Sequence, residues 1–287
     1  MKPFAVLLAS ALLAAGPLTA QTPVDPKSPI PGYPDGRGPK GPVTVKIVSP
    51  TADEVIPWPA AVEGQPAPKG ARVEVKVTVE NFETFKDEAT GRGQQVQLVL
   101  NGRALPAWYQ IDKPWVFPAL PKGTHTLLAF VQRPWQESIR EPGAFAAVTF
   151  HVGEKNGKPG FDLAQPAITV GAPRGKFKGA DVARILFDVY VTGCKVGPAT
   201  DAEACQIVYR LNQDPQQILT AWAPVIWENL PAGKHSYVVA LYRGEKRIEA
   251  PFALAQGSFE VEAAAAPAAP AAPAAPAAPA APAPPAG

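Results

Sequence analysis

The stretch Leu120-Pro-Lys-Gly-Thr-His-Thr-Leu-Leu-Ala-Phe-Val-Gln-Arg133 returns in the second half of the chain as Leu230-Pro-Ala-Gly-Lys-His-Ser-Tyr-Val-Val-Ala-Leu-Tyr-Arg243. In both places a Leu-Pro-x-Gly-x-His turn leads directly into a long apolar segment. The match between the two copies continues upstream, where each has a Leu-Asn pair. Leu100-Asn101 lies twenty residues before the first turn, and Leu211-Asn212 lies nineteen residues before the second. These offsets indicate a tandem duplication.

The body of each copy alternates apolar and polar residues. Segments 43–48, 73–79 and 95–100 follow this period of two, and each ends at turn residues. Each copy offers about six or seven such short segments, joined by turns rich in Pro and Gly. The pattern predicts an all-β chain made of two tandem antiparallel β-sandwich domains.

Three motifs of these copies resemble exported bacterial immunoglobulin-like and fibronectin-III-like modules. They are the Asn-Gly hairpin at 101–102, the Leu-Pro-x-Gly-x-His turn, and the Phe-x-Val segments that close the copies at 150–152 and 259–261. The resemblance covers both copies, although the Cys…Trp…Cys pattern of antibody domains is absent. It implies an Ig-like sandwich used for adhesion, scaffolding or ligand binding, and it assigns no active-site residue.

The two ends of the chain differ from this body. Lys2, the apolar segment 4–15 and the break at Gly16-Pro17 are typical of a secretory signal peptide. Residues 263–287 contain only Ala, Pro and Gly, which predicts an extended, disordered tail. The expected parts are, in order, a signal peptide (1–20), a Pro/Gly-rich flexible arm (21–42), the first Ig-like sandwich (43–153), a linker (154–165), the second sandwich (166–262) and the tail (263–287).

Composition narrows the possible functions. The 287 residues carry 27 Lys+Arg and 25 Asp+Glu, so the basic excess of a typical nucleic-acid-binding protein is missing. The sequence has no Gly-x-Ser-x-Gly elbow, no His-Glu-x-x-His pair and no Gly-rich phosphate loop. We therefore expect a protein that is not an enzyme, uses no cofactor, and has no transmembrane segment once its signal is cleaved.

The two cysteines of the chain, Cys194 and Cys205, bracket a short loop in the second copy. An even number of cysteines in an exported protein favours a structural disulfide. Closing a loop of this size stabilises a fold by roughly 3 kcal/mol in the chain-entropy model. We therefore predict a bond between these two residues rather than a reactive thiol or a metal ligand.

The three histidines leave two interpretations open. His125 occupies the same place as its counterpart in the second copy, which favours a structural role in ordering the turn. His151 is expected at the same end of the sheet as His125. This leaves open a metal site with Asp112 or Glu154 as a further ligand.

Aromatic residues beside prolines are the strongest candidates for a ligand-binding surface. Flat aromatic faces in loops stack on sugar rings or anchor a partner protein. Trp58 and Trp135 have no aromatic counterpart in the second copy, which favours a role outside the shared core. The predicted surface consists of Trp58, Trp108, Tyr109 and Trp135. The alternative is that these rings pack over the ends of their own sandwich.

Together these features predict an exported, non-catalytic binding or interaction protein that is periplasmic or extracellular. Its expected partner is a protein or glycan of the envelope or extracellular space, bound by loops that the sandwiches hold in place. The first alternative is a carbohydrate-binding protein that uses the loop tryptophans. The second alternative is a metal-binding periplasmic protein.

Overall fold

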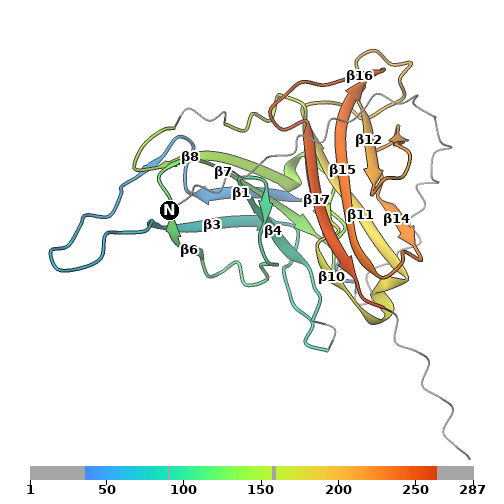
Figure 1. Cartoon of the computed structure of the whole chain (residues 1–287). Coiled ribbons are helices and arrows are strands. Elements are labelled where there is room, and N and C mark those ends of the chain that lie inside the picture. The colour runs from blue at the N-terminus through green and yellow to red at the C-terminus, as the bar shows by residue number, and fades with distance from the viewer. Residues whose placement is uncertain (1–35, 90, 157–159, 264–287) are drawn as a thin grey trace, which may run out of the picture.

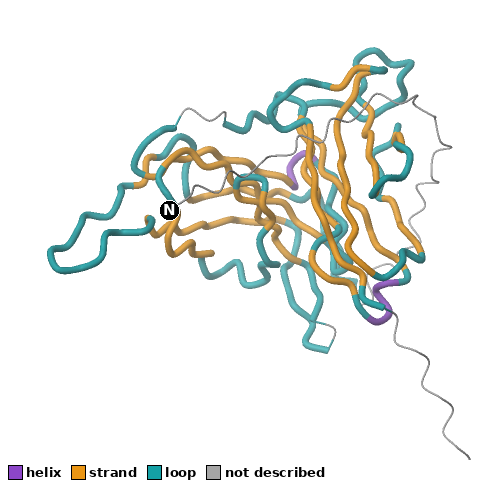
Figure 2. The backbone as a smooth tube through the Cα atoms, viewed as in Figure 1, coloured by secondary structure: helices purple, strands orange, loops and turns teal. Residues whose placement is uncertain are grey.

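The computed structural model describes residues 36–89, 91–156 and 160–263 (Figure 1). The expected signal peptide, most of the expected arm and nearly all of the expected tail lie outside these residues. Within them the chain forms two β-sandwich modules, and Figure 2 shows only two short helical turns, η1 (Pro142–Ala144) and η2 (Gly179–Val182), among the strands. The predicted all-β, tandem-sandwich fold is confirmed.

The first module pairs a three-stranded sheet with a five-stranded one. The smaller sheet runs in the order β1 (Thr44–Ser49), β3 (Ala71–Glu80), β6 (Trp115–Leu120). The larger sheet contains, in order, β2 (Val55–Ile56), β8 (Phe145–Val152), β7 (Gly123–Gln132), β4 (Gln95–Leu100) and β5 (Arg103–Ala104). Only β2 pairs in parallel, with β8, so the chain crosses from one sheet to the other between β1 and β2.

The second module repeats this arrangement. Its smaller sheet runs β14 (Val225–Glu228), β11 (Arg184–Thr192), β9 (Ala167–Ala172). Its larger sheet runs β10 (Gly175–Phe177), β17 (Leu254–Val261), β15 (Gly233–Arg243), β12 (Gln206–Leu211), β13 (Gln217–Leu219), with β16 (Lys246–Arg247) beside β15. Again one strand, β10, pairs in parallel with the last strand. The strand order supports the duplication inferred from the sequence.

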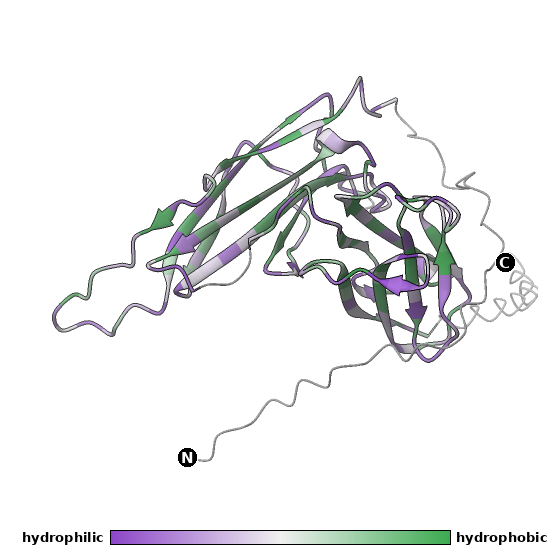
Figure 3. Cartoon of the chain, turned by 90° about the horizontal axis from the view of Figure 1, so that it is seen from above, coloured by the Kyte–Doolittle hydropathy of each residue, from purple (hydrophilic) through white to green (hydrophobic). Residues whose placement is uncertain are grey.

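The apolar side chains at every second position of the strands fill the interior of each sandwich. Figure 3 shows hydrophobic and hydrophilic positions alternating along the strands. In the first module Val73 and Val75 of β3 join a core that also contains Leu127 of β7. In the second module Phe187 of β11 stacks on Trp227 of β14, with ring centroids 4.8 Å apart. Alternation therefore selects the face that each strand buries, as expected for antiparallel sheets.

A buried histidine orders the turn before β7 in the first module and the turn before β15 in the second. The Nδ1 atom of His125 lies 2.9 Å from the amide nitrogen of Asn101, and its Nε2 lies 2.9 Å from the carbonyl oxygen of Pro121. His235 makes the same two contacts at 3.0 and 2.8 Å. A neutral imidazole that accepts at Nδ1 and donates at Nε2 satisfies both partners. The repeated histidines are thus architectural.

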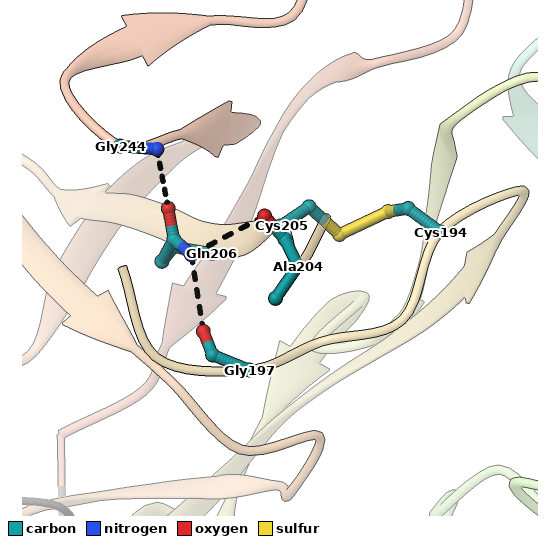
Figure 4. The surroundings of a disulfide bond; sticks show 6 residues. All are labelled: Cys194, Gly197, Ala204, Cys205, Gln206 and Gly244. Carbon is teal, nitrogen blue, oxygen red and sulfur yellow. Dashed lines mark hydrogen bonds between the residues drawn. A yellow bond between two sulfur atoms is a disulfide. The ribbon is translucent and has the colours of Figure 1, made fainter. Parts of the chain in front are cut away.

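The predicted disulfide between Cys194 and Cys205 is confirmed (Figure 4). The side chain of Gln206, beside it, donates a hydrogen bond from Nε2 to the carbonyl oxygen of Gly197 (3.1 Å). Its Oε1 accepts one from the backbone nitrogen of Gly244 (2.9 Å). The loop between the cysteines is therefore held to β12 by a covalent bond and by a buried glutamine.

The two modules pack directly against each other. Strand β7 is buried along its whole length, because one of its faces lies in the first core and the other contacts the second module. On that second face Phe130 lies 6.0 Å from Tyr190 of β11, and Phe145 of β8 stacks on the same tyrosine at 4.7 Å (ring centroids). In Figure 1 the strands of the first module run across the view and those of the second run up it.

Candidate functional site

A buried ion pair joins the modules beside this aromatic cluster. Asp188 of β11 is 0% exposed and accepts a hydrogen bond from the backbone nitrogen of Ser138 (3.0 Å). Arg140 of the first module forms an ion pair with Asp188 and with Glu137 (2.8 Å to the latter). Burial raises the pKa of Asp188, and the Arg140 guanidinium opposes that rise. The carboxylate of one module is thus held by donors of the other.

A second polar contact across the joint centres on Arg174, which follows the Pro173 that ends β9. Its Nη2 donates to Oε1 of Gln132 (3.0 Å), and the Nε2 of that glutamine donates to the carbonyl oxygen of Gly171 (3.1 Å). Its Nη1 is buried and has no hydrogen-bond partner within the described residues. Burial lowers the pKa of Arg174 to about 10, so the guanidinium remains charged at neutral pH.

Three neighbouring hollows that share lining residues extend from the loops of the first module to the joint. The first, of about 920 Å³, lies among loops of the first module and shares Gly91 and Tyr109 with the second, of about 450 Å³. The second shares Arg92 and Arg174 with the third, of about 220 Å³, which lies between Trp135 and the second module. We call these three hollows the joint groove. The second and third hollows have walls from both modules, so they exist only while the modules stay packed together.

The joint groove is basic where it crosses from one module to the other. Five residues of the second and third hollows carry a positive charge: Arg92, Arg103, Arg174, Lys176 and Arg184. Three of them form ion pairs at the surface, namely Arg92 with Asp181, Lys176 with Glu260 (3.2 Å) and Arg184 with Glu228 (3.3 Å). Arg103 and Arg174 form no ion pair within the described part of the chain. These two arginines therefore lack a direct ion-pair partner, and the buried carboxylate of Asp188 offsets part of the charge of Arg174 through space.

Two of the predicted surface aromatics line this groove. Trp135 is half-buried and fixed in place by a hydrogen bond from its Nε1 to Oε2 of Glu137 (2.7 Å). Tyr109 is half-buried between the first two hollows, with the Nζ of Lys86 5.9 Å from its ring centroid. Burial raises the pKa of Tyr109, so its hydroxyl stays protonated at neutral pH. Both rings come from the first module.

The other two predicted aromatics lie differently. Trp108 borders the first hollow, but it is only 6% exposed and packs edge-on against Trp115, so its ring belongs to the core. Trp58 lies beyond β2, away from the joint groove, and the Nζ of Lys122 lies 5.2 Å from its ring centroid. These two residues follow the packing alternative that the sequence left open.

The metal site considered for His125 and His151 is not formed. In the pairing of β7 with β8, Thr124 lies opposite His151 and His125 lies opposite Phe150, so the two imidazoles point to opposite faces of the sheet. The His151 ring contacts Thr124 Oγ1 (2.9 Å) and Oδ1 of Asp53 (3.1 Å), and neither expected carboxylate is its partner. No group of three or more His, Cys, Asp or Glu that could hold a metal occurs in the described residues.

Sequence reasoning missed Arg174 and Asp188. One signal for Asp188 was present, because it is a single charge inside the apolar run Ile185-Leu-Phe-Asp-Val-Tyr-Val191. A charge in such a run requires a buried partner. Arg174 gave no local signal, since its hydrogen-bond partner Gln132 lies in the other module.

Comparisons with known proteins identify no family. No protein-family model and no curated protein matches the chain. Among solved structures, it is similar to fibronectin(III)-like modules of Clostridium thermocellum CbhA, with 12% identity and a TM-score of 0.27 over 77% of this chain and 94% of that one. It is also similar to Bacteroides ovatus SGBP-B of a mixed-linkage glucan utilization locus, in complex with a mixed-linkage heptasaccharide, with 12% identity and a TM-score of 0.21 over 76% and 70% of the two chains.

Among the residues that the structure describes, none belongs to a helix with the length and apolar character needed to cross a membrane.

Proposed function

We propose that this chain is an exported, non-catalytic binding protein of the cell envelope or extracellular space, and that its ligand lies along the joint groove. One observation carries the proposal: Tyr109 and Trp135 line neighbouring hollows beside a joint whose two modules are held together by buried contacts. A site that is already ordered loses little conformational entropy on binding, which favours affinity.

Two features support export. Residues 1–20 have the pattern of a signal peptide, although they lie outside the described residues. The Cys194–Cys205 disulfide is of a kind that persists in oxidising compartments such as the periplasm. At the joint the carboxylates of Glu137 and Asp188 are both paired with Arg140, which supports a structural role for these ionisable groups rather than a catalytic one.

Replacing Trp135 by alanine is expected to weaken ligand binding about 30-fold, the effect of losing a central aromatic contact. Soluble neutral and acidic polysaccharides would be titrated against the purified chain, with tryptophan fluorescence as the readout. Components of an envelope fraction would be captured on the immobilised protein in parallel.

The matched control for this variant is Trp58→Ala, which removes an equally large ring outside the groove. We expect it to bind like the unmodified chain. Equal losses in the two variants, or no loss in either, would rule out the joint groove as the binding site.

A further inference from the structure

We propose that the ligand of the joint groove is a carboxylate-bearing polysaccharide, and that Arg174 binds its carboxylate groups. This inference rests on the proposed function and adds the chemical class of the ligand. It depends on three properties of the groove: an incompletely paired guanidinium, a shortage of exposed apolar anchors, and an aromatic wall beside the positive charge.

Arg174 is a charged group of the groove whose hydrogen bonding is incomplete. Its only hydrogen-bonded partner in the described residues is the neutral amide of Gln132, and its Nη1 is buried without one. A guanidinium largely withdrawn from water gains more from an anionic partner than an exposed one does. A carboxylate accepts two parallel N–H bonds from an arginine, so a sugar carboxylate in the adjoining hollow is a suitable partner for this guanidinium.

The position of Arg174 within the fold is specific to the second module. It follows the cis Ala172-Pro173 bond, and the residue that follows the equivalent cis Ser49-Pro50 bond is Thr51. The fold therefore does not require an arginine at this point. Trp135 is likewise without an aromatic counterpart in the other copy. Two residues that the architecture does not need thus meet in one hollow of about 220 Å³.

The lining of the groove favours a glycan over a protein segment. Protein partners are anchored by apolar side chains that fill desolvated pockets. The described residues include six large exposed hydrophobics: Val48, Val55, Val62, Val116, Leu163 and Leu254. None of them lines the three hollows of the joint groove, and only Leu254 lines the neighbouring hollow of about 790 Å³ that also contacts Arg103 and Arg174. The groove instead offers arginine and lysine side chains beside the faces of two aromatic rings. Sugar rings stack on such faces, and their carboxylates pair with such cations.

The surface ion pairs of the groove are compatible with this ligand. Exposed pairs of this kind contribute about 0–1 kcal/mol each, so their cations exchange partners at little cost. Lys176 and Arg184 are then able to turn from their own carboxylates to those of the ligand. An elongated polymer also suits a groove that continues from Trp135 to Tyr109.

The test uses one polymer in two forms, with sodium polygalacturonate as the acidic form and its fully methyl-esterified derivative as the neutral one. Esterification caps each carboxylate and leaves the sugar backbone unchanged. We expect the full chain to bind the acidic form, with an affinity that falls as salt is added, and to bind the ester roughly tenfold or more weakly. Arg174→Gln should lower affinity for the acidic form by a similar factor.

The matched control variant is Arg210→Gln, which removes one partly buried positive charge from β12, outside the groove. It should bind the acidic polymer like the unmodified chain. Circular dichroism checks that each variant is folded, and the comparison of the two polymers on the unmodified chain needs no variant at all.

Three results would overturn the inference: equal binding of both polymer forms, equal losses in the two arginine variants, or no binding of the acidic form. If neutral glycans or envelope proteins still bind in a manner that depends on Trp135, the groove remains the site and only the ligand class is wrong. Loss of that dependence as well would remove the proposed function itself.

Discussion

Replacing Asp188 by alanine is expected to lower the free energy of unfolding by about 3–5 kcal/mol, because it removes the carboxylate by which the second module pairs with the buried Arg140 and leaves that arginine only Glu137 of its own module. The side chain of Arg140 is only 16% exposed, so water cannot replace the lost carboxylate. The backbone nitrogen of Ser138 also loses its acceptor. Urea unfolding followed by circular dichroism measures the effect.

The control for this variant is Glu80→Ala, which breaks an exposed pair with Lys46 in the first module. Exposed pairs contribute about 0–1 kcal/mol, so this change should leave the midpoint nearly unaltered. A loss in Asp188→Ala no greater than in the control would show that the Arg140–Asp188 pair does not hold the modules together.

Replacing Phe130 by alanine is expected to cost about 3–5 kcal/mol as well, through the cavity left between the modules. Phe130 is fully buried, and its ring contacts Phe145 and Tyr190. Because Tyr190 belongs to β11 of the second module, the substitution in the first module should also lower the amide exchange protection of β11.

Phe150→Ala provides the matched comparison, since Phe150 is equally buried but packs inside the first core. It should destabilise the first module and leave the exchange protection of β11 close to that of the unmodified chain. If the two variants affect β11 alike, the aromatic cluster does not couple the modules in the way described.

Most of the fold followed from the sequence because local rules were sufficient. Alternating segments such as 73–79 set the strand faces, and the repeated Leu-Pro-x-Gly-x-His turn marked equivalent strands in both copies. Packing between the modules was missed, although the run Leu127-Leu-Ala-Phe-Val131 contained a signal for it. An uninterrupted apolar run indicates a strand covered on both faces, and an alternating one indicates a strand with a solvated face.

The candidate site was only partly predictable, for a physical reason. Trp135 and Tyr109 were found by residue type and by their neighbouring prolines, which are local features. Trp108 has the same features but lies in the core. Residue type and neighbouring prolines therefore did not distinguish an aromatic residue that lines the groove from one buried in the core. Arg174 acquired its role from the way two modules dock, and that docking depends on contacts between residues far apart in the sequence.

Rigid docking matters for function because the joint groove has one wall in each module. A flexible tandem pair would vary the distance between Trp135 and Arg174 and would lose affinity to the entropy of ordering. The aromatic cluster between the modules and the Arg140–Asp188 pair therefore support binding indirectly, because they hold the two modules in a fixed arrangement and do not contact the ligand. Variants that loosen the joint should weaken binding even though every groove residue is intact.

The most direct measurement is the distance distribution between spin labels placed on the two modules of the full chain. Labels carried by unnatural amino acids at Lys76 of β3 and Lys246 of β16 would leave the Cys194–Cys205 bond unaltered. Pulsed electron paramagnetic resonance should then give a single narrow peak, which broadens in Asp188→Ala and Phe130→Ala. A broad distribution in the unmodified chain would contradict a joint groove built on two locked modules.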